Sequence, residues 1–162
     1  MSSRTSATTI LVCDDSPTYA KALAQFLGLQ PGLEVVGLCA TGEEALESLR
    51  RFPPDLVMMD LEMPGMGGLA AIKEIMRDDQ LPIVVLSGHV DDGSMLAAAA
   101  LAAGALATIS KDHLRLDEPD GPAATALALR LRRLSHARIG PSGEIGTAAP
   151  ARRASTRRRH DR

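Results

Sequence analysis

Carboxylates follow two short apolar runs of the sequence, and together they could bind a metal ion. Asp14 and Asp15 come directly after residues 10–13, and Asp60 comes directly after residues 56–59. Each run suits a strand buried on both faces, and parallel strands end at one edge of a sheet, where open α/β sheets bind ligands. Three carboxylates at one edge repel one another, and a hard divalent cation such as Mg²⁺ relieves that repulsion. Taken singly, each aspartate could simply end its strand.

Two further polar side chains follow later apolar runs, Ser87 after residues 83–86 and Lys111 after residues 106–110. A lysine and a hydroxyl group opposite carboxylates suit an incoming phosphoryl group, since Lys111 would neutralise one oxygen and Ser87 would hydrogen-bond another. Asp60 would then be the nucleophile and form an aspartyl phosphate. Strand termination explains any one of these side chains, but it explains poorly five of compatible chemistry at one edge.

Five strand–helix units would bring these residues together, and the sequence predicts all five. The predicted strands cover residues 10–13, 33–40, 56–59, 83–86 and 106–110. A helix is predicted after each strand. Ser16 favours the start of the first helix, Thr41 that of the second, and Asp91 or Ser94 that of the fourth. The last helix is predicted to run from 122 to about 136. This alternation predicts an α/β fold with a doubly wound parallel sheet and right-handed crossovers.

The composition suits one ordinary domain with an aliphatic core. The 162 residues include only three aromatic side chains, and the longest apolar run, residues 95–103, is too short to span a bilayer. The N-terminal residues lack the apolar core of a signal peptide, so we expect a cytoplasmic protein. Cys13 and Cys39 both fall inside predicted strands, which favours reduced, buried thiols.

Charge divides the chain into an acidic body and a basic end. Residues 1–121 carry 18 acidic and 8 basic side chains, a net charge of −10, whereas residues 122–162 carry 10 arginines and 2 acids, a net charge of +8. We expect a flexible N-terminus at 1–7, a folded domain at 8–137 and a disordered basic tail at 138–162. The tail could contact nucleic acid, but it lacks aromatic residues for stacking, and its composition favours a solvated tail.

The chain from 8 to 137 resembles a response-regulator receiver domain of two-component signalling. The resemblance is carried by these residues: Asp14-Asp15-Ser16, Asp60 followed by Met63-Pro64 and Gly68, Ser87-Gly88, and Gly104-Ala105 before Lys111. The run from 61 to 69 is especially similar to receivers attached to chemotaxis methylesterases. The family implies a flavodoxin-like (βα)5 fold with the strand order 2-1-3-4-5.

The resemblance also implies a role for each carboxylate. Asp60 would accept a phosphoryl group from a phosphohistidine on a sensor histidine kinase or a histidine phosphotransfer protein. Mg²⁺ would be held by Asp15 directly, by Asp14 through water, by Asp60, and by the main-chain carbonyl group of Glu62. The phosphorylated domain would change its binding to a downstream protein.

Ser87 and Lys111 are implied to read the phosphorylated state, yet the sequence departs from the family beside them. Thr108 stands three positions before the lysine, where most receivers carry an aromatic or other large switch residue. Asp112 follows the lysine, where receivers commonly have a proline after a cis peptide bond. Two alternatives to a switch therefore stay open: a phosphate sink, and a constitutive interaction module that does not depend on phosphorylation.

The sequence gives less support to the hypothesis that the protein is a phosphatase or a hydrolase. Asp60-x-Glu62 is similar to the paired carboxylates of haloacid-dehalogenase-type phosphatases, but Glu62 is one methylene longer than the usual aspartate, and little chain remains for a cap. The sequence contains no Gly-x-Ser-x-Gly, and about two dozen residues after the last predicted helix cannot house a Ser-His-Asp hydrolase. The sequence thus predicts a signalling domain rather than an enzyme, without a recognisable output domain.

Overall fold

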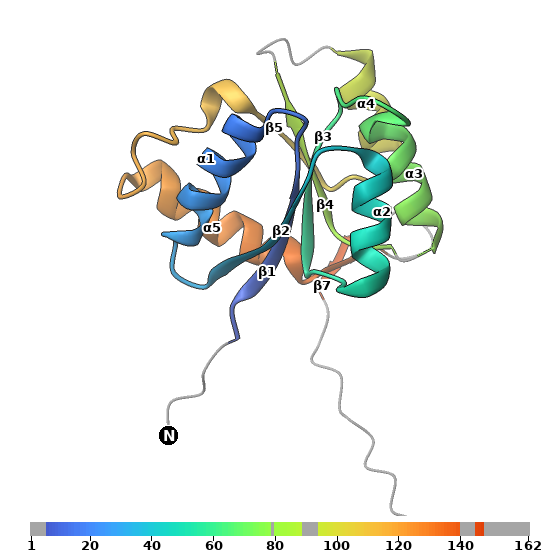
Figure 1. Cartoon of the computed structure of the whole chain (residues 1–162). Helices are drawn as coiled ribbons and strands as arrows, with labels where there is room; N and C mark the ends of the chain where they lie inside the picture. The colour runs from blue at the N-terminus through green and yellow to red at the C-terminus, as the bar shows by residue number, and fades with distance from the viewer. Residues whose placement is uncertain (1–5, 79, 89–93, 140–144, 148–162) are drawn as a thin grey trace, which may run out of the picture.

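A parallel sheet of five strands forms the centre of the molecule (Figure 1). The structure is a computed structural model, and it describes residues 6–78, 80–88, 94–139 and 145–147. The strands lie in the order β2-β1-β3-β4-β5, which confirms the predicted fold and strand order. Their bounds are β1 (Thr8–Cys13), β2 (Leu33–Cys39), β3 (Leu56–Asp60), β4 (Ile83–Ser87) and β5 (Ala107–Ser110).

Helices cover both faces of this sheet, as a doubly wound fold requires (Figure 1). One apolar core lies between the sheet and α1 and α5, and the other lies between the sheet and α2, α3 and α4. Across the described parts of the chain, every helix is too short or too polar to cross a membrane. The helices are α1 (Pro17–Gly28), α2 (Gly42–Arg51), α3 (Gly67–Asp78), α4 (Met95–Ala102) and α5 (Pro122–Ser135), and a 3₁₀ turn covers Lys111–His113.

Side-chain caps fix where the first two helices begin. The Ser16 hydroxyl group accepts a hydrogen bond from the Tyr19 N–H at 3.3 Å, so α1 starts directly after the first aspartates. The Thr41 hydroxyl group accepts from the Glu44 N–H at 3.1 Å, and the Glu44 carboxylate accepts from the Ala40 N–H at 2.9 Å. Both predicted caps are confirmed.

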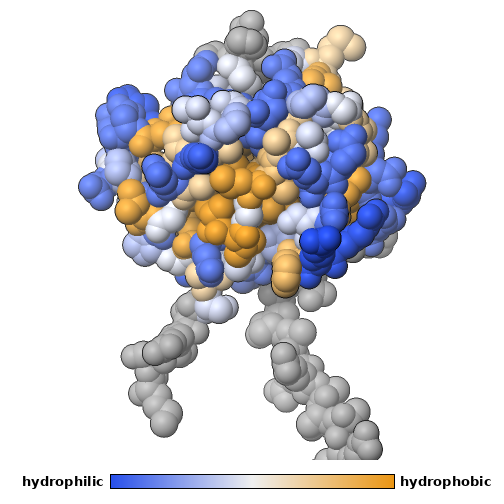
Figure 2. Space-filling view, viewed as in Figure 1, coloured by the Kyte–Doolittle hydropathy of each residue, from blue (hydrophilic) through white to orange (hydrophobic). Residues whose placement is uncertain are grey.

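The edge strand β2 contains a bulge and exposes apolar side chains. Its register with β1 shifts between Ile10 and Leu11, so that β2 carries one extra residue, Val36. Val36 and Leu38 are 46% and 44% exposed. Figure 2 shows an apolar surface over this strand, between α1 and α2.

The described elements differ from the predicted ones mainly at their ends. The second strand ends at Cys39 and the second helix at Arg51, each one residue earlier than predicted. Ser94 caps α4, whereas Asp91, the alternative cap, lies outside the described residues.

A short antiparallel pair of strands, β6 (Ala137–Ile139) and β7 (Ile145–Thr147), occupies part of the predicted disordered tail. The prediction of disorder is therefore wrong for residues 138–139 and 145–147, whereas Ala137 belongs to the predicted domain. Strands of three residues are too short to show a detectable alternation of polar and apolar positions. Residues 1–5, 140–144 and 148–162 lie outside the described residues, so the predicted domain limits stay a prediction.

Candidate functional site

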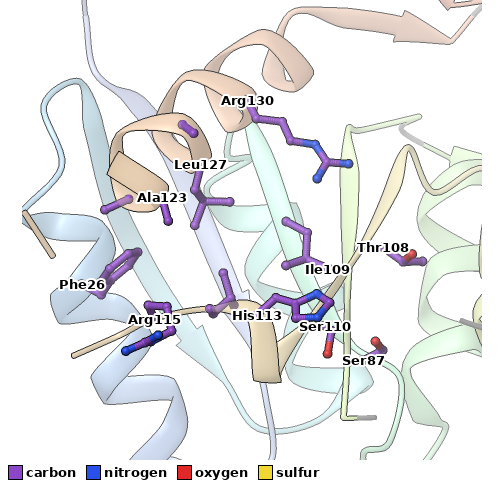
Figure 3. A pocket seen from close by; sticks show the side chains of 13 residues that line it. Phe26, Ser87, Thr108, Ile109, Ser110, His113, Arg115, Ala123, Leu127 and Arg130 are labelled. Atoms are coloured by element: carbon purple, nitrogen blue, oxygen red, sulfur yellow. The ribbon is translucent and has the colours of Figure 1, made fainter. Parts of the chain in front are cut away.

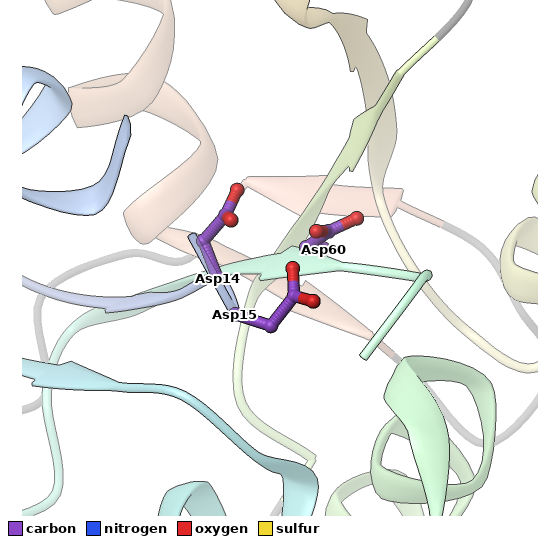
Figure 4. Close-up of side chains that lie close together, drawn as sticks. All are labelled: Asp14, Asp15 and Asp60. Carbon is purple, nitrogen blue, oxygen red and sulfur yellow. The ribbon is translucent and has the colours of Figure 1, made fainter. Parts of the chain in front are cut away.

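Three aspartates meet at the carboxyl ends of β1 and β3 (Figure 4). Asp14 and Asp15 follow β1, and Asp60 is the last residue of β3. One carboxylate oxygen from each lies within 4.8 Å of the others. Asp14 and Asp60 are buried, whereas Asp15 is exposed to solvent. The sheet thus brings together the three carboxylates that the sequence placed at its edge.

The ammonium group of Lys111 lies directly against two of these carboxylates. Its Nζ atom is 2.5 Å from Asp14 Oδ2 and 3.1 Å from Asp60 Oδ2. Burial lowers the pKa of Lys111, but the contacts with Asp14 and Asp60 outweigh that effect, and the net result is a raised pKa. The lysine therefore stays charged and is the counter-charge of the cluster.

The other oxygen of each buried aspartate accepts a backbone hydrogen bond. Asp14 Oδ1 accepts from the Ser16 N–H at 2.9 Å, and Asp60 Oδ1 accepts from the Glu62 N–H at 3.1 Å. Burial raises the pKa of Asp60, although the Glu62 N–H and Lys111 oppose that rise. Both carboxylates are thereby held with one oxygen turned toward the ammonium group.

This set of donors fits a hard divalent cation. Lys111 carries one positive charge against three carboxylates, so the cluster keeps an excess of negative charge. The buried Asp14 Oδ2 atom accepts no hydrogen bond in the described structure, and it contacts a charged group only through the ion pair with Lys111. Carboxylate oxygens are ligands that Mg²⁺ prefers, and Asp14, Asp15 and Asp60 would hold the ion.

The loop after β3 is held in place by one glycine and one distant carboxylate. The Gly68 N–H donates to the Leu61 carbonyl at 3.2 Å, and a Cβ atom at Gly68 would overlap the Asp60 carbonyl oxygen. The Glu43 carboxylate, on α2, accepts from the Met66 N–H at 2.9 Å. Sequence reasoning missed Glu43, because no local pattern signals a contact between residues so far apart in the chain.

Ser87 ends β4 as predicted, at the same edge of the sheet as the carboxylates. No hydrogen bond or ion pair joins it to the three aspartates in the described structure. Its side chain instead lines a cavity of about 360 Å³ between β5 and α5 (Figure 3). Thr108, Ser110 and Arg130 also line this cavity.

Tyr19 is a site residue that sequence reasoning missed. Its ring centroid lies 4.7 Å from Lys111 Nζ, a distance typical of a cation–π contact. Its hydroxyl oxygen is buried, with no hydrogen-bond partner among the described residues. Burial, and then the charges of Asp14 and Asp60, raise the pKa of Tyr19 to about 12. Its position in the first turn of α1, just after the aspartates, was the available signal.

We expect the raised pKa of Tyr19 to make the fold sensitive to alkaline pH. An ordinary tyrosine ionises near pH 10, so the unfolded chain loses its proton first, and stability falls as the pH rises from 10 toward about 12. The loss is expected to be about 2 kcal/mol in the wild type and absent in Tyr19→Phe. The chain has one tyrosine and no tryptophan, so phenolate absorbance reports this group alone. Titration near pH 10 in the folded protein would contradict the prediction.

Comparisons with known proteins point to one family. The model of the response regulator receiver domain matches residues 10–117. A protein-glutamate methylesterase/protein-glutamine glutaminase of Geobacillus kaustophilus is 35% identical over 151 residues, which cover 93% of this chain and 40% of that protein. A protein of the same description from Myxococcus xanthus is 42% identical over 123 residues, covering 76% of this chain and 34% of that protein.

Solved structures agree with the sequence comparisons. The response regulator domain of Thermotoga maritima CheB superposes with a TM-score of 0.70 and 30% sequence identity, covering 80% of this chain and 96% of that one. A LuxR-family response regulator from an Aurantimonas species gives a TM-score of 0.66 at 29% identity, covering 85% of this chain and 92% of that chain. The chain spans about 40% or less of the length of the methylesterases described above.

Proposed function

The chain belongs to the response regulator receiver domains of two-component signalling, and from that premise we propose that Asp60 accepts a phosphoryl group in a Mg²⁺-dependent reaction in the cytoplasm. The phosphodonor would be a phosphohistidine on a sensor histidine kinase or a phosphotransfer protein. The observation that carries the proposal is the meeting of Asp60 with two further carboxylates and Lys111 at one edge of the sheet.

The residues of the site have separate tasks in this transfer. An Asp60 carboxylate oxygen attacks phosphorus, the P–N bond to the donor histidine breaks, and the imidazole leaves. The Glu62 N–H holds Asp60 Oδ1 and thereby orients the carboxylate. Lys111 can exchange its contact with Asp60 Oδ2 for a phosphoryl oxygen. When bound, Mg²⁺ would neutralise charge on the transferred group.

The same exchange would carry the signal away from the site. Ser87 lies at the end of β4, at the same sheet edge as Asp60, and a change of its rotamer would bring its hydroxyl group toward a phosphoryl oxygen. Such a shift would alter the surface formed by α4, β5 and α5. Met95 and Leu101 on α4 and Leu129 on α5 are exposed apolar side chains, which suit a protein partner.

Mass spectrometry after incubation with acetyl phosphate tests the chemistry. The wild type is expected to gain about 80 Da when Mg²⁺ is present, and Asp60→Asn is expected to gain nothing, because the nucleophile is gone. Asp15→Asn should keep the adduct but need more Mg²⁺. Asp78→Asn, which changes an exposed aspartate at the end of α3, is the matched control and should label like the wild type.

Two results would contradict the proposal. An adduct that persists in Asp60→Asn would place the acceptor elsewhere. A wild type that takes up no phosphoryl group at any Mg²⁺ concentration would favour an interaction module that does not depend on phosphorylation.

A further inference from the structure

The two cysteines of the chain lie side by side at the ends of neighbouring strands. Cys13 ends β1, Cys39 ends β2, and the two are partners in the register of this parallel pair. Both thiols are free, and both belong to the core beneath α2 and α3, so they point to the same face of the sheet. Neighbouring strands are about 4.8 Å apart, which lies within the separation of Cα atoms that a disulfide bridges.

The two thiols differ in their access to solvent. Cys13 is completely buried, whereas Cys39 keeps 6% exposure. Cys39 also lines a cavity of about 370 Å³ between β2 and α2, together with Ser48 and Phe52. The neighbouring Cys13 thiol lowers the pKa of the Cys39 thiol, although burial opposes that change. A small reagent that enters this cavity therefore reaches Cys39 first and finds Cys13 directly behind it.

From this arrangement we infer that Cys39 and Cys13 form an oxidisable dithiol whose substrate is a small hydroperoxide. The Cys39 sulfur attacks one oxygen of hydrogen peroxide, the O–O bond breaks, and Cys39 sulfenic acid and water form. The Cys13 sulfur then attacks the Cys39 sulfur, the S–S bond forms, and the sulfenic oxygen leaves as a second water with the Cys13 proton. Two electrons pass from the dithiol to the peroxide.

The position of this pair links it to the aspartate cluster. The Asp14 N–H donates a hydrogen bond to the Cys39 carbonyl group at 2.9 Å, and Asp14 directly follows Cys13. A disulfide would join the two backbone segments that position the Asp14 carboxylate. An effect of oxidation on phosphorylation rests on the proposed function, whereas the oxidation itself does not.

The intact mass of the full chain tests the oxidation independently of any phosphoryl transfer. Reduced wild-type protein treated with hydrogen peroxide is expected to lose about 2 Da as a monomer and to regain this mass with dithiothreitol. Peptide mapping without reduction should recover the peptides of Cys13 and Cys39 as one linked species. These are the only cysteines in the sequence, so the mass change has one intramolecular assignment.

Single variants test the order of the two steps. In Cys13→Ala the Cys39 sulfenic acid has no partner and should be trapped by dimedone, whereas in Cys39→Ala the remaining Cys13 should react at least about tenfold more slowly. Because either variant could unfold, circular dichroism must first show a native spectrum, and the wild-type measurement stands by itself. The inference is overturned if methionine oxidation appears before any loss of 2 Da in the wild type, or if Cys13 reacts faster than Cys39.

Discussion

Lys111→Met is expected to lower the free energy of unfolding by about 3 kcal/mol in Mg²⁺-free solution, because it removes one partner of a buried ion cluster. The Lys111 ammonium group contacts Asp14 and Asp60, whose side chains are 0% and 6% exposed. Without it, two buried carboxylates would face each other with no nearby positive charge. Urea unfolding followed by circular dichroism measures the change.

Lys111→Met could lower the free energy of unfolding by removing a charge or by removing packing contacts, and the dependence of the loss on Mg²⁺ and on pH distinguishes these two causes. Saturating Mg²⁺ should shrink the difference between Lys111→Met and the wild type, because the cation replaces the ammonium group. Acid should shrink it too, because burial raises the pKa of Asp60 and its protonated carboxyl group needs no counter-charge. Lys73→Met, on the exposed side of α3, is the matched control and should change stability by less than about 0.5 kcal/mol. Equal stability of Lys111→Met and the wild type without Mg²⁺ would contradict the account.

Gly68→Ala is the second substitution with a large expected effect, a loss of about 4 kcal/mol in the free energy of unfolding. The added Cβ atom would overlap the Asp60 carbonyl oxygen and lie 2.7 Å from the Leu61 Cα atom. Both are backbone atoms of the turn that leads from β3 into α3, so no flexible side chain can move aside. Relief of the overlap must shift Asp60, and labelling by acetyl phosphate should fall with stability.

Alanine substitutions at two other glycines measure the ordinary cost of replacing a glycine, without the overlap expected at Gly68. Gly67 has a φ of +77° but open space around it, so Gly67→Ala should cost only about 1 kcal/mol of backbone strain. Gly28, at the end of α1, has neither a positive φ nor a close neighbour, and Gly28→Ala should leave stability nearly unchanged. Similar losses in Gly68→Ala and Gly67→Ala would show that the overlap has no special cost.

Local chemistry was enough to predict the framework of this molecule. Three of the apolar runs form strands that are buried along nearly their whole length, and Ser16 and Thr41 cap helices where their side chains predict a cap. The meeting of Asp14 and Asp60 followed from one fact of topology, that parallel strands end at the same edge of a sheet. Lys111 joined them for the same reason.

The contacts that local patterns do not determine were missed. Tyr19 reaches Lys111 because of the rotation of α1 on the sheet, and helical periodicity predicts a buried face without naming the partner of each side chain. The Glu43 contact with the Met66 N–H depends on how the first turn of α2 approaches the loop after β3. Ser87 ends its strand as predicted, yet it makes no hydrogen bond with the aspartates in the described structure, because strand position alone does not decide a rotamer.

The extra residue in β2 also affects the tendency of this protein to aggregate through its edge strand. An edge strand with exposed Val36 and Leu38 offers free backbone groups and apolar side chains to a neighbouring chain, which could extend the sheet and begin an aggregate. The bulge at Val36 breaks the regular spacing that such pairing requires. A second chain could match β2 on only one side of the bulge, so the irregularity works against growth of the sheet from molecule to molecule.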